Sequence, residues 1–267
     1  MDPVILVKGG GDIGTAVAVR LHQAGRQIVV AESPGTPILR RGISFGTAID
    51  QDEVVVDGVP SRPVGTKAQA RALLADRVVP VWTAGWEAAL DALSLQILVD
   101  ARMLKRNQNT ETRKDHAPLV IGLGPGFTAG EDVHLAIETN HGPDLGRIIR
   151  EGAAEPYTGI ARVIQGYGKE RYHYAPIDGI FLATREIGAR VEADEVLGRI
   201  GGEELKARFA GIVRGILKPG TTVRKGQKLV DLDPRGDEMV TRTFTDRPLK
   251  IAEAVLLAID DWERNQE

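Results

Sequence analysis

The chain has 267 residues, no cysteine, and 34 Lys plus Arg against 37 Asp plus Glu, a formal net charge of −3. The absence of cysteine excludes disulfides, cysteine-ligated zinc, iron–sulfur clusters and thiolate nucleophiles. The near-neutral charge and an aromatic content of 4% argue against a nucleic-acid-binding protein, which needs a concentrated basic surface and aromatic stacking platforms. Hydrophobic residues make up 42% of the chain, enough for a folded core.

The sequence shows no membrane-spanning segment and no secretory signal. No apolar run approaches the ~18 residues of a membrane span, and the first residues lack the basic segment of a secretory signal. We therefore expect a cytoplasmic protein. The sequence also allows a homo-oligomer.

Residues 1–155 alternate short apolar runs with helix-length stretches. The runs are Val4–Val7, Gln27–Ala31, Glu53–Val56, Val78–Trp82, Leu95–Val99, Leu119–Leu123 and Leu135–Thr139, and the helical stretches between them are Ile13–Gln23, Lys67–Ala75 and Glu87–Leu93. Several runs are rich in Val and Ile without clean alternation, as in strands covered on both faces. This rhythm predicts a Rossmann-like α/β domain with a doubly wound, mostly parallel sheet.

Residues 156–240 have a different texture, with short Val, Ile and Leu runs between glycine-containing turns, which predicts a β-rich module. Two stretches, 175–201 and 207–232, repeat each other at one constant offset: Gly179 matches Gly211 and Leu197 matches Leu229. Such self-similarity indicates one supersecondary unit used twice, here as a two-fold pseudosymmetric β-sandwich. In residues 241–267 an apolar stripe predicts a helix over Arg247–Arg264 that packs back on the protein.

The sharpest local motif is a glycine turn between the first strand and the first helix, G-x-G-x-x-G at Gly9, Gly11 and Gly14. Gly9 permits a tight turn, Gly11 a close approach of the backbone to a pyrophosphate, and Gly14 close packing of helix on strand. Glu32, at the end of the next strand, would accept a ribose hydroxyl. The alternative is a turn of the same shape that binds nothing.

Charged residues follow the strand Leu95–Val99, where ligands bind in open α/β sheets. Asp100, Arg102 and Lys105 are therefore candidates for an anionic ligand, with a solvated surface loop as the alternative. Arg40 and Arg41, earlier in the chain, would grip a phosphate or form an ordinary solvated pair.

A second glycine-rich loop follows the strand Leu119–Leu123. Loops rich in exposed backbone N–H groups bind anions, and the candidates here are Gly122, Gly124, Gly126 and Thr128, joined by Glu138 and Asn140 after the next strand. No Walker lysine follows, so this is not a P-loop NTPase. We interpret Glu131 and Asp132 as acids in the first turn of a helix rather than metal ligands, and expect no metal site. No catalytic set stands out, so the sequence leaves open whether the protein is an enzyme.

Several stretches resemble the YqeB-type family, named as selenium-dependent molybdenum hydroxylase system proteins. They are VDARMLKRN at 99–107, GLGPGFTAGEDV at 122–133, IETNHG at 137–142 and DLDPRG at 231–236. The resemblance implies an accessory protein for maturation of a molybdenum hydroxylase, which would be its partner, acting through a molybdopterin-type cofactor. The family is also distantly similar to XdhC-type Rossmann proteins. Because the chain has no thiol, it cannot itself carry sulfur or selenium as a persulfide.

The repeat module resembles biotinyl/lipoyl-type β-sandwich domains. In the carrier members a lysine lies on the hairpin between the halves, where this chain has Arg199 to Gly202. We therefore predict no covalent biotin or lipoate.

Together these features predict an accessory protein that binds an anionic, phosphate-bearing ligand, molybdopterin or a nucleotide, between the two glycine turns. One alternative is an NAD(P)-dependent oxidoreductase that uses the Gly9–Gly14 turn. The other is a non-enzymatic docking module with its partner surface on the β-rich part. The second glycine loop discriminates the first two, because a dehydrogenase does not need it.

Overall fold

The structure is a computed structural model that describes residues 4–104 and 111–266. The chain divides into two compact units. Unit 1 comprises residues 1–34, 44–158 and 244–267, and unit 2 comprises residues 35–43 and 159–243. Unit 2 therefore takes a short segment from the N-terminal part of the chain, and the C-terminal segment belongs to unit 1.

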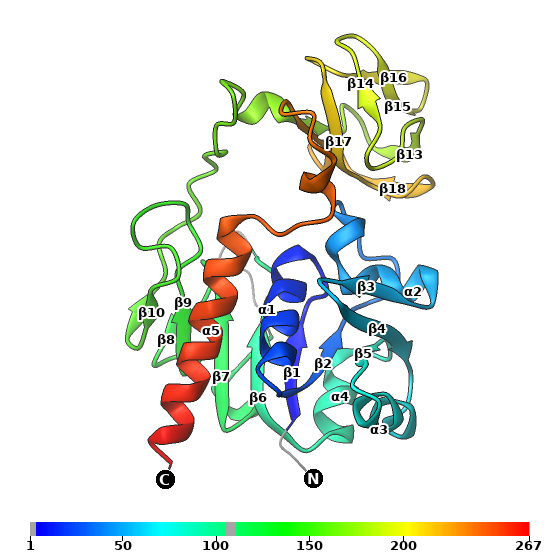
Figure 1. Ribbon diagram of the computed structural model, residues 1–267. Helices are drawn as coiled ribbons and strands as arrows, with labels where there is room; N and C mark the ends of the chain where they lie inside the picture. The colour runs from blue at the N-terminus through cyan, green and yellow to red at the C-terminus, as the bar shows by residue number, and fades with distance from the viewer. Residues whose placement is uncertain (1–3, 105–110, 267) are drawn as a thin grey trace. The chain divides into compact units, whose positions relative to one another are not determined.

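A nine-stranded sheet forms the centre of unit 1, in the order β10-β9-β7-β6-β1-β2-β5-β4-β3 (Figure 1). Its strands are β1 (Val4–Lys8), β2 (Gln27–Ala31), β3 (Val54–Val56), β4 (Val59–Val64), β5 (Val79–Trp82), β6 (Leu95–Asp100), β7 (Leu119–Leu123), β9 (Leu135–Ile137) and β10 (Ile148–Ile149). The central strands pair in parallel, whereas β3 and β10 run antiparallel to their neighbours at the two edges. The β1 strand is buried along its whole length, as its unbroken apolar sequence predicts.

Helices cover this sheet. They are α1 (Asp12–Gln23), α2 (Ala48–Gln51), α3 (Lys67–Ala75), α4 (Trp86–Ala92) and α5 (Asp246–Arg264). The short elements are η2 (Phe45–Thr47), η3 (Lys114–His116), β8 (Thr128–Ala129) and β11 (Gly152–Ala153). Helix α5 lies along α1 (Figure 1) and buries Ile251, Val255 and Ile259. Burying such side chains contributes roughly 1.5–3 kcal/mol each, and the predicted C-terminal helix is confirmed.

Unit 2 contains two four-stranded antiparallel sheets, with orders β12-β19-β17-β14 and β16-β15-β13-β18. The strands are β12 (Tyr172–Tyr174), β13 (Gly179–Ala183), β14 (Arg190–Val191), β15 (Val196–Ile200), β16 (Glu203–Lys206), β17 (Gly211–Ile216), β18 (Thr221–Val223) and β19 (Lys228–Asp233); the 3-10 turns are η1 (Arg41–Ile43), η4 (Lys169–Arg171) and η5 (Glu238–Thr241). The sequence repeat corresponds to β13-β14-β15 and β17-β18-β19. Each sheet takes two strands from one half of the repeat and the middle strand from the other half.

The predicted fold class, a Rossmann-like doubly wound sheet joined to a biotinyl/lipoyl-like sandwich, is wrong. The sheet of unit 1 is mixed, and in the described residues the connections from β6 to β7 and from β7 to β9 contain no α-helix, although a doubly wound sheet carries one in each crossover. The C-terminal α5 covers the sheet instead. In unit 2, the extra edge strands β12 and β16 and the segment 35–43 depart from a simple two-half sandwich.

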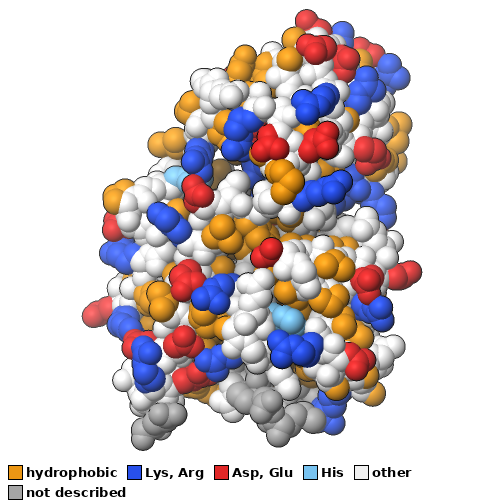
Figure 2. All heavy atoms as spheres, viewed as in Figure 1, with side chains coloured by type: hydrophobic (Ala, Val, Ile, Leu, Met, Phe, Trp, Pro, Cys, Tyr) orange, Lys and Arg blue, Asp and Glu red, His pale blue; other side chains and the backbone are white. Residues whose placement is uncertain are grey.

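Two surface properties bear on function. None of the helices in residues 4–104 and 111–266 has the length and apolar content that crossing a membrane requires. Figure 2 shows acidic and basic side chains interspersed on the face in view, without a broad field of one sign.

Candidate functional site

The carboxyl ends of β1, β6 and β7 lie next to one another at one edge of the unit 1 sheet. These strands are parallel neighbours, and Lys8 pairs with Asp100 while Asp100 pairs with Gly122. The glycine turn after β1 and the glycine loop after β7 therefore follow the same edge, on either side of the end of β6. This is the edge at which ligands bind in open α/β sheets.

The glycines of the first turn are required by close packing. Gly9 has φ +110°, and a Cβ on it would lie 3.1 Å from the Arg102 nitrogen; a Cβ on Gly14 would overlap the Gly9 carbonyl oxygen. A Cβ on Gly11 would meet nothing within 4 Å. The turn is thus held tightly at Gly9 and Gly14 and has open space beside Gly11, the position predicted to approach a pyrophosphate.

Glu32 is bound by backbone amides at this edge. Its Oε2 accepts from the Gly10 nitrogen at 2.8 Å, and its Oε1 accepts from the Ser33 nitrogen at 2.8 Å. A ribose hydroxyl would have to share oxygens that already hold the turn. The carboxylate also places a negative charge on the turn, where a dinucleotide would place its pyrophosphate.

The end of β6 carries a buried ionic cluster. Asp100 is inaccessible to solvent, and its Oδ2 accepts from Arg102 Nη2 at 2.8 Å and from Thr112 Oγ1 at 2.7 Å. Lys8 Nζ lies 3.9 Å from the same oxygen and donates to Thr112 Oγ1 at 3.2 Å. One buried carboxylate therefore faces two cations, of which only Arg102, with 27% of its side chain exposed, reaches solvent.

Lys8 has an unusual environment for a lysine. It is 2% exposed, and its Nζ lies 3.2 Å from the centroid of the Trp86 ring. Burial lowers the pKa of Lys8 to about 8, against the opposing effect of Asp100 and of the exposed carboxylates Glu87 and Glu111. Such an amine binds an anion as ammonium and releases its proton near pH 8.

The second glycine loop is also shaped by packing. A Cβ on Gly122 would overlap the Phe127 ring, and Gly124, with φ +83°, leaves room for the Thr139 side chain. Gly126 has φ +100°. Thr128 begins β8, and its nitrogen donates to Asp132 Oδ2 at 2.9 Å. The expectation that Asp132 lies in the first turn of a helix is wrong, because this stretch is a turn after β8.

Glu138 and Asn140 hold backbone together. The Glu138 carboxylate is buried and accepts from the nitrogens of Thr139, Asn140 and Glu155, each at 2.7 Å. The Asn140 side chain donates to the carbonyl oxygen of Pro156 at 3.0 Å. These contacts fasten the end of β9 to residues 155–156.

The sequence analysis missed Lys8, Thr112 and Trp86. The signal for Lys8 was a charged residue that ends an otherwise apolar buried strand, since lysine is almost never buried without a partner. Of the predicted residues, Asp100 and Arg102 are joined in the cluster, whereas Lys105 lies outside the described residues. In the part of the chain that the structure describes, no three His, Cys, Asp or Glu side chains group as metal ligands.

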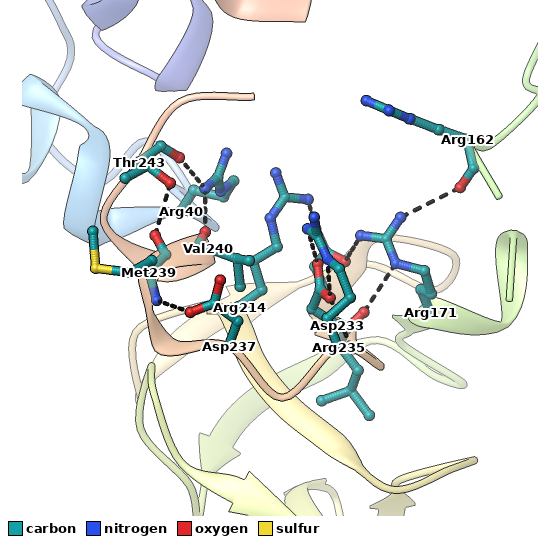
Figure 3. Close-up of polar contacts among 12 residues, drawn as sticks. Arg40, Arg162, Arg171, Arg214, Asp233, Arg235, Asp237, Met239, Val240 and Thr243 are labelled. Atoms are coloured by element: carbon teal, nitrogen blue, oxygen red, sulfur yellow. Dashed lines mark hydrogen bonds and ion pairs between the residues drawn. The ribbon is translucent and has the colours of Figure 1, made fainter. Parts of the chain in front are cut away.

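A second charged cluster lies in unit 2 at strand β19 (Figure 3). Asp231, 3% exposed, accepts from Arg171 Nη2 and from Arg214 Nη1, each at 2.9 Å. Asp233 accepts from Arg235 Nε at 2.9 Å and Nη2 at 2.7 Å. Burial opposes ionisation of Asp233, but the hydrogen bonds from Arg235 hold its pKa below the ordinary value.

Arg40 and Arg41, the earlier phosphate candidates, both donate to backbone carbonyls. Arg40 Nη2 donates to the carbonyls of Val240 at 2.8 Å and Thr243 at 3.1 Å (Figure 3), and Arg41 Nε to that of Ile216 at 3.1 Å. Neither begins an α-helix. Arg40 is 6% exposed, so it is not part of an ordinary solvated pair.

Comparison with solved structures returns proteins of the aspartoacylase and succinylglutamate desuccinylase kind. The ectoine utilization protein EutE (DoeB) of Ruegeria pomeroyi is 14% identical, with 86% of each chain covered and a TM-score of 0.26. An aspartoacylase family protein of Mesorhizobium loti is 11% identical, with 87% and 85% covered and a TM-score of 0.28. A succinylglutamate desuccinylase/aspartoacylase of Rhodobacter sphaeroides is 19% identical, with 86% and 85% covered and a TM-score of 0.27. TM-scores this far below 0.5 carry no argument about the fold or the activity of this chain.

Comparison with curated sequences gives a stronger similarity. No family model matches the chain. The uncharacterized protein YqeB of Escherichia coli strain K12 is 37% identical over 256 residues, which is 96% of this chain and 47% of that protein. The chain thus spans about half the length of the curated relative it matches. The resemblance to YqeB seen in the motifs is confirmed as a similarity along nearly the whole chain.

Proposed function

We propose that the protein binds a phosphate-bearing anionic ligand of the molybdopterin type at the carboxyl edge of the unit 1 sheet. In this proposal it serves as an accessory protein in the maturation of a selenium-dependent molybdenum hydroxylase. The binding rests on one observation: Lys8 and Arg102 share the single buried carboxylate of Asp100 at this edge. The maturation role rests on the YqeB resemblance of the sequence alone.

The cluster supports an anion because of its charge and position. Arg102 is the cation of the cluster that reaches solvent, and a guanidinium binds phosphate through paired, charge-assisted hydrogen bonds. Glycine turns flank Arg102 on both sides, so a ligand with a phosphate at one end and a ring at the other would contact both.

An oxidoreductase that binds NAD(P) at the Gly9–Gly14 turn is disfavoured. Its ribose acceptor would be Glu32, whose two oxygens already accept from Gly10 and Ser33. The accessory protein and the oxidoreductase differ in the ligand that they would bind, a phosphorylated pterin or NAD(P).

The test is isothermal titration of the full chain with a phosphorylated pterin, its dephosphorylated form and NADH. We expect binding of the phosphorylated pterin, and Arg102→Ala should weaken it by about 1–3 kcal/mol, since a charge-assisted hydrogen bond is lost.

Arg113→Ala is the matched control. Arg113 lies in the same connection between β6 and β7 as Arg102, and 66% of its side chain is exposed. We expect it to bind like the wild type. Binding of NADH without the pterin, or equal affinity in the Arg102 and Arg113 variants, contradicts the proposal.

A further inference from the structure

The cluster at β19 in unit 2 buries two guanidinium groups against one carboxylate. Arg171, Arg214 and Arg235 bind Asp231 and Asp233, and both aspartates are buried. Arg171 is 1% exposed and Arg214 is 8% exposed. A cation is costly to bury without a counter-charge, and here the two buried guanidinium groups of Arg171 and Arg214 share the one carboxylate of Asp231.

A β-bulge directs Arg214 into this cluster. In the ladder of β17 with β19, Val213 pairs with Leu232 and Gly215 pairs with Asp231, so Arg214 is the extra residue of β17. Bulges redirect a side chain and are common beside functional sites. Here the bulge places Arg214 against Asp231, one strand away.

One edge of the Arg214 guanidinium lacks an acceptor. Nη1 donates to Asp231 Oδ2 at 2.9 Å, whereas Nε is buried and has no hydrogen-bond partner among the described residues. A buried polar atom without a partner is rare in a native protein and indicates a ligand, ion or water. The Nε side of a guanidinium is the side that binds a carboxylate or phosphate with two parallel hydrogen bonds.

The segment 35–43 brings a second arginine to this strand. Gly215 follows the bulge, and a Cβ on it would lie 2.9 Å from the Leu39 carbonyl oxygen and 3.3 Å from Arg40 Cγ. The Ile216 nitrogen donates to that carbonyl at 3.0 Å. Arg40 therefore packs on β17 at Gly215, the residue after Arg214, and Figure 3 labels both arginines.

We propose that Arg214, with Arg40 beside it, forms a binding site within unit 2 for a phosphate group, either free or carried by a larger ligand. The phosphate would accept from the Nε edge of Arg214 and supply a second negative charge for the two arginines that share Asp231. Asp231 is a positioning residue because it accepts from Nη1 of Arg214, and Arg171 in turn holds the other oxygen of Asp231. This site is separate from the proposed site in unit 1.

The other half of the repeat argues that the cluster is not required by the strand architecture. At the positions equivalent to Arg214 and Asp231, the first half carries Leu182, 55% exposed, and Arg199. There Leu182 pairs with Arg199 in a regular ladder without a bulge. The same strands therefore form without the charges.

The test is side-chain NMR of the full chain, observing arginine Nε–H resonances during titration with inorganic phosphate at constant ionic strength. We expect the Arg214 resonance to shift and saturate with phosphate and not with chloride, while that of Arg199 stays unchanged. The Arg102 resonance reports the unit 1 site separately, so either proposal can fail alone.

Arg214→Lys identifies the resonance and tests the site, since lysine keeps the charge beside Asp231 and loses the Nε edge. In an Arg102→Ala background, which removes the unit 1 contact, phosphate should raise the melting temperature of the parent and of Arg199→Lys but not of Arg214→Lys. Through-bond assignment in the wild type identifies the same resonance if that variant does not fold. An Arg214 resonance that responds equally to chloride, or not at all, overturns the proposal.

Discussion

The two halves of the unit 2 repeat build equivalent strands from different chemistry. The second half carries Arg214 in a bulge and two buried aspartates on β19, whereas the first half has Leu182 in a regular ladder and Arg199 on β15. The segment 35–43 packs against β17 of the second half. The repeated pattern thus determines the strands, and the positions that depart from it form the buried charged cluster at β19.

The comparison of the two halves also indicates that the buried charges are not needed for the stability of the strands. A buried ion pair is weak evidence for stability, because desolvating the charges offsets their attraction. The first half forms its sheet with apolar residues and exposed ion pairs such as Arg199 with Glu204. The buried charges of the second half therefore need a reason other than the fold, and an anion site supplies one.

The largest expected difference between the halves follows from removing the shared carboxylate. Asp231→Asn leaves Arg171 and Arg214 buried without a counter-charge, which should lower the free energy of unfolding by about 3–5 kcal/mol. Urea denaturation measures it. Glu204→Gln, which breaks the exposed pair of Arg199 in the first half, is the control and should leave the midpoint unchanged. Equal effects in the two variants would contradict the contrast drawn between the halves.

The next difference concerns pH. His173 lies on β12, beside β19, and is 1% exposed; burial, with Arg208 nearby, lowers its pKa to about 4. Since an unfolded histidine has a pKa near 6.5, the unfolded chain binds more protons between about pH 6.5 and 4, and the folded state loses stability as the pH falls through this window.

His173→Leu should remove about 1–3 kcal/mol of that loss, measured as the difference in unfolding free energy between pH 7 and pH 4. The edge strand of the other sheet, β16, has no histidine. A variant with the same pH dependence as the wild type would mean that His173 is not the group responsible.

The smallest effect tests the close approach at β17. Gly215→Ala places a Cβ 2.9 Å from the Leu39 carbonyl oxygen, which should cost about 1–2 kcal/mol, at the lower end of overpacking effects. Ala183 is the equivalent residue of the first half, is partly buried and already carries a Cβ that packs on the core of unit 2. Ala183→Gly should cost only about 0.5–1 kcal/mol through backbone entropy, and chemical denaturation compares the two. Gly215→Ala as stable as the wild type would show that segment 35–43 does not pack as described.

Local patterns predicted most elements of unit 1 well. The strands β1, β2, β6 and β7 and the helix α5 form where the apolar runs and the helical stripe lie. The pattern missed β4, because Pro60 and Pro63 interrupt it and proline is rare inside a sheet. The alternation of apolar runs and helical stretches also led to the prediction of a doubly wound sheet, which is wrong.

Only some residues of the candidate sites could be predicted from the sequence. Asp100 and Arg102 were found because they follow a strand, and Lys8 was missed because its partner lies on β6, far along the chain. Arg171, Arg214 and Asp231 are likewise ordinary charged residues until β17, β19 and η4 bring them together.

The amino-acid sequence by itself determined the local elements, the repeat in unit 2 and the glycines at Gly9 and Gly14, because propensity, periodicity and steric freedom act over a few residues. Tertiary structure alone decided that Glu32 binds the Gly10 turn, that Asp100 balances Lys8 and Arg102, and that an N-terminal segment joins unit 2. The physical reason is that burial and charge pairing depend on which distant residues become neighbours, and the strength of an ionic contact is set by the water that the fold removes from it.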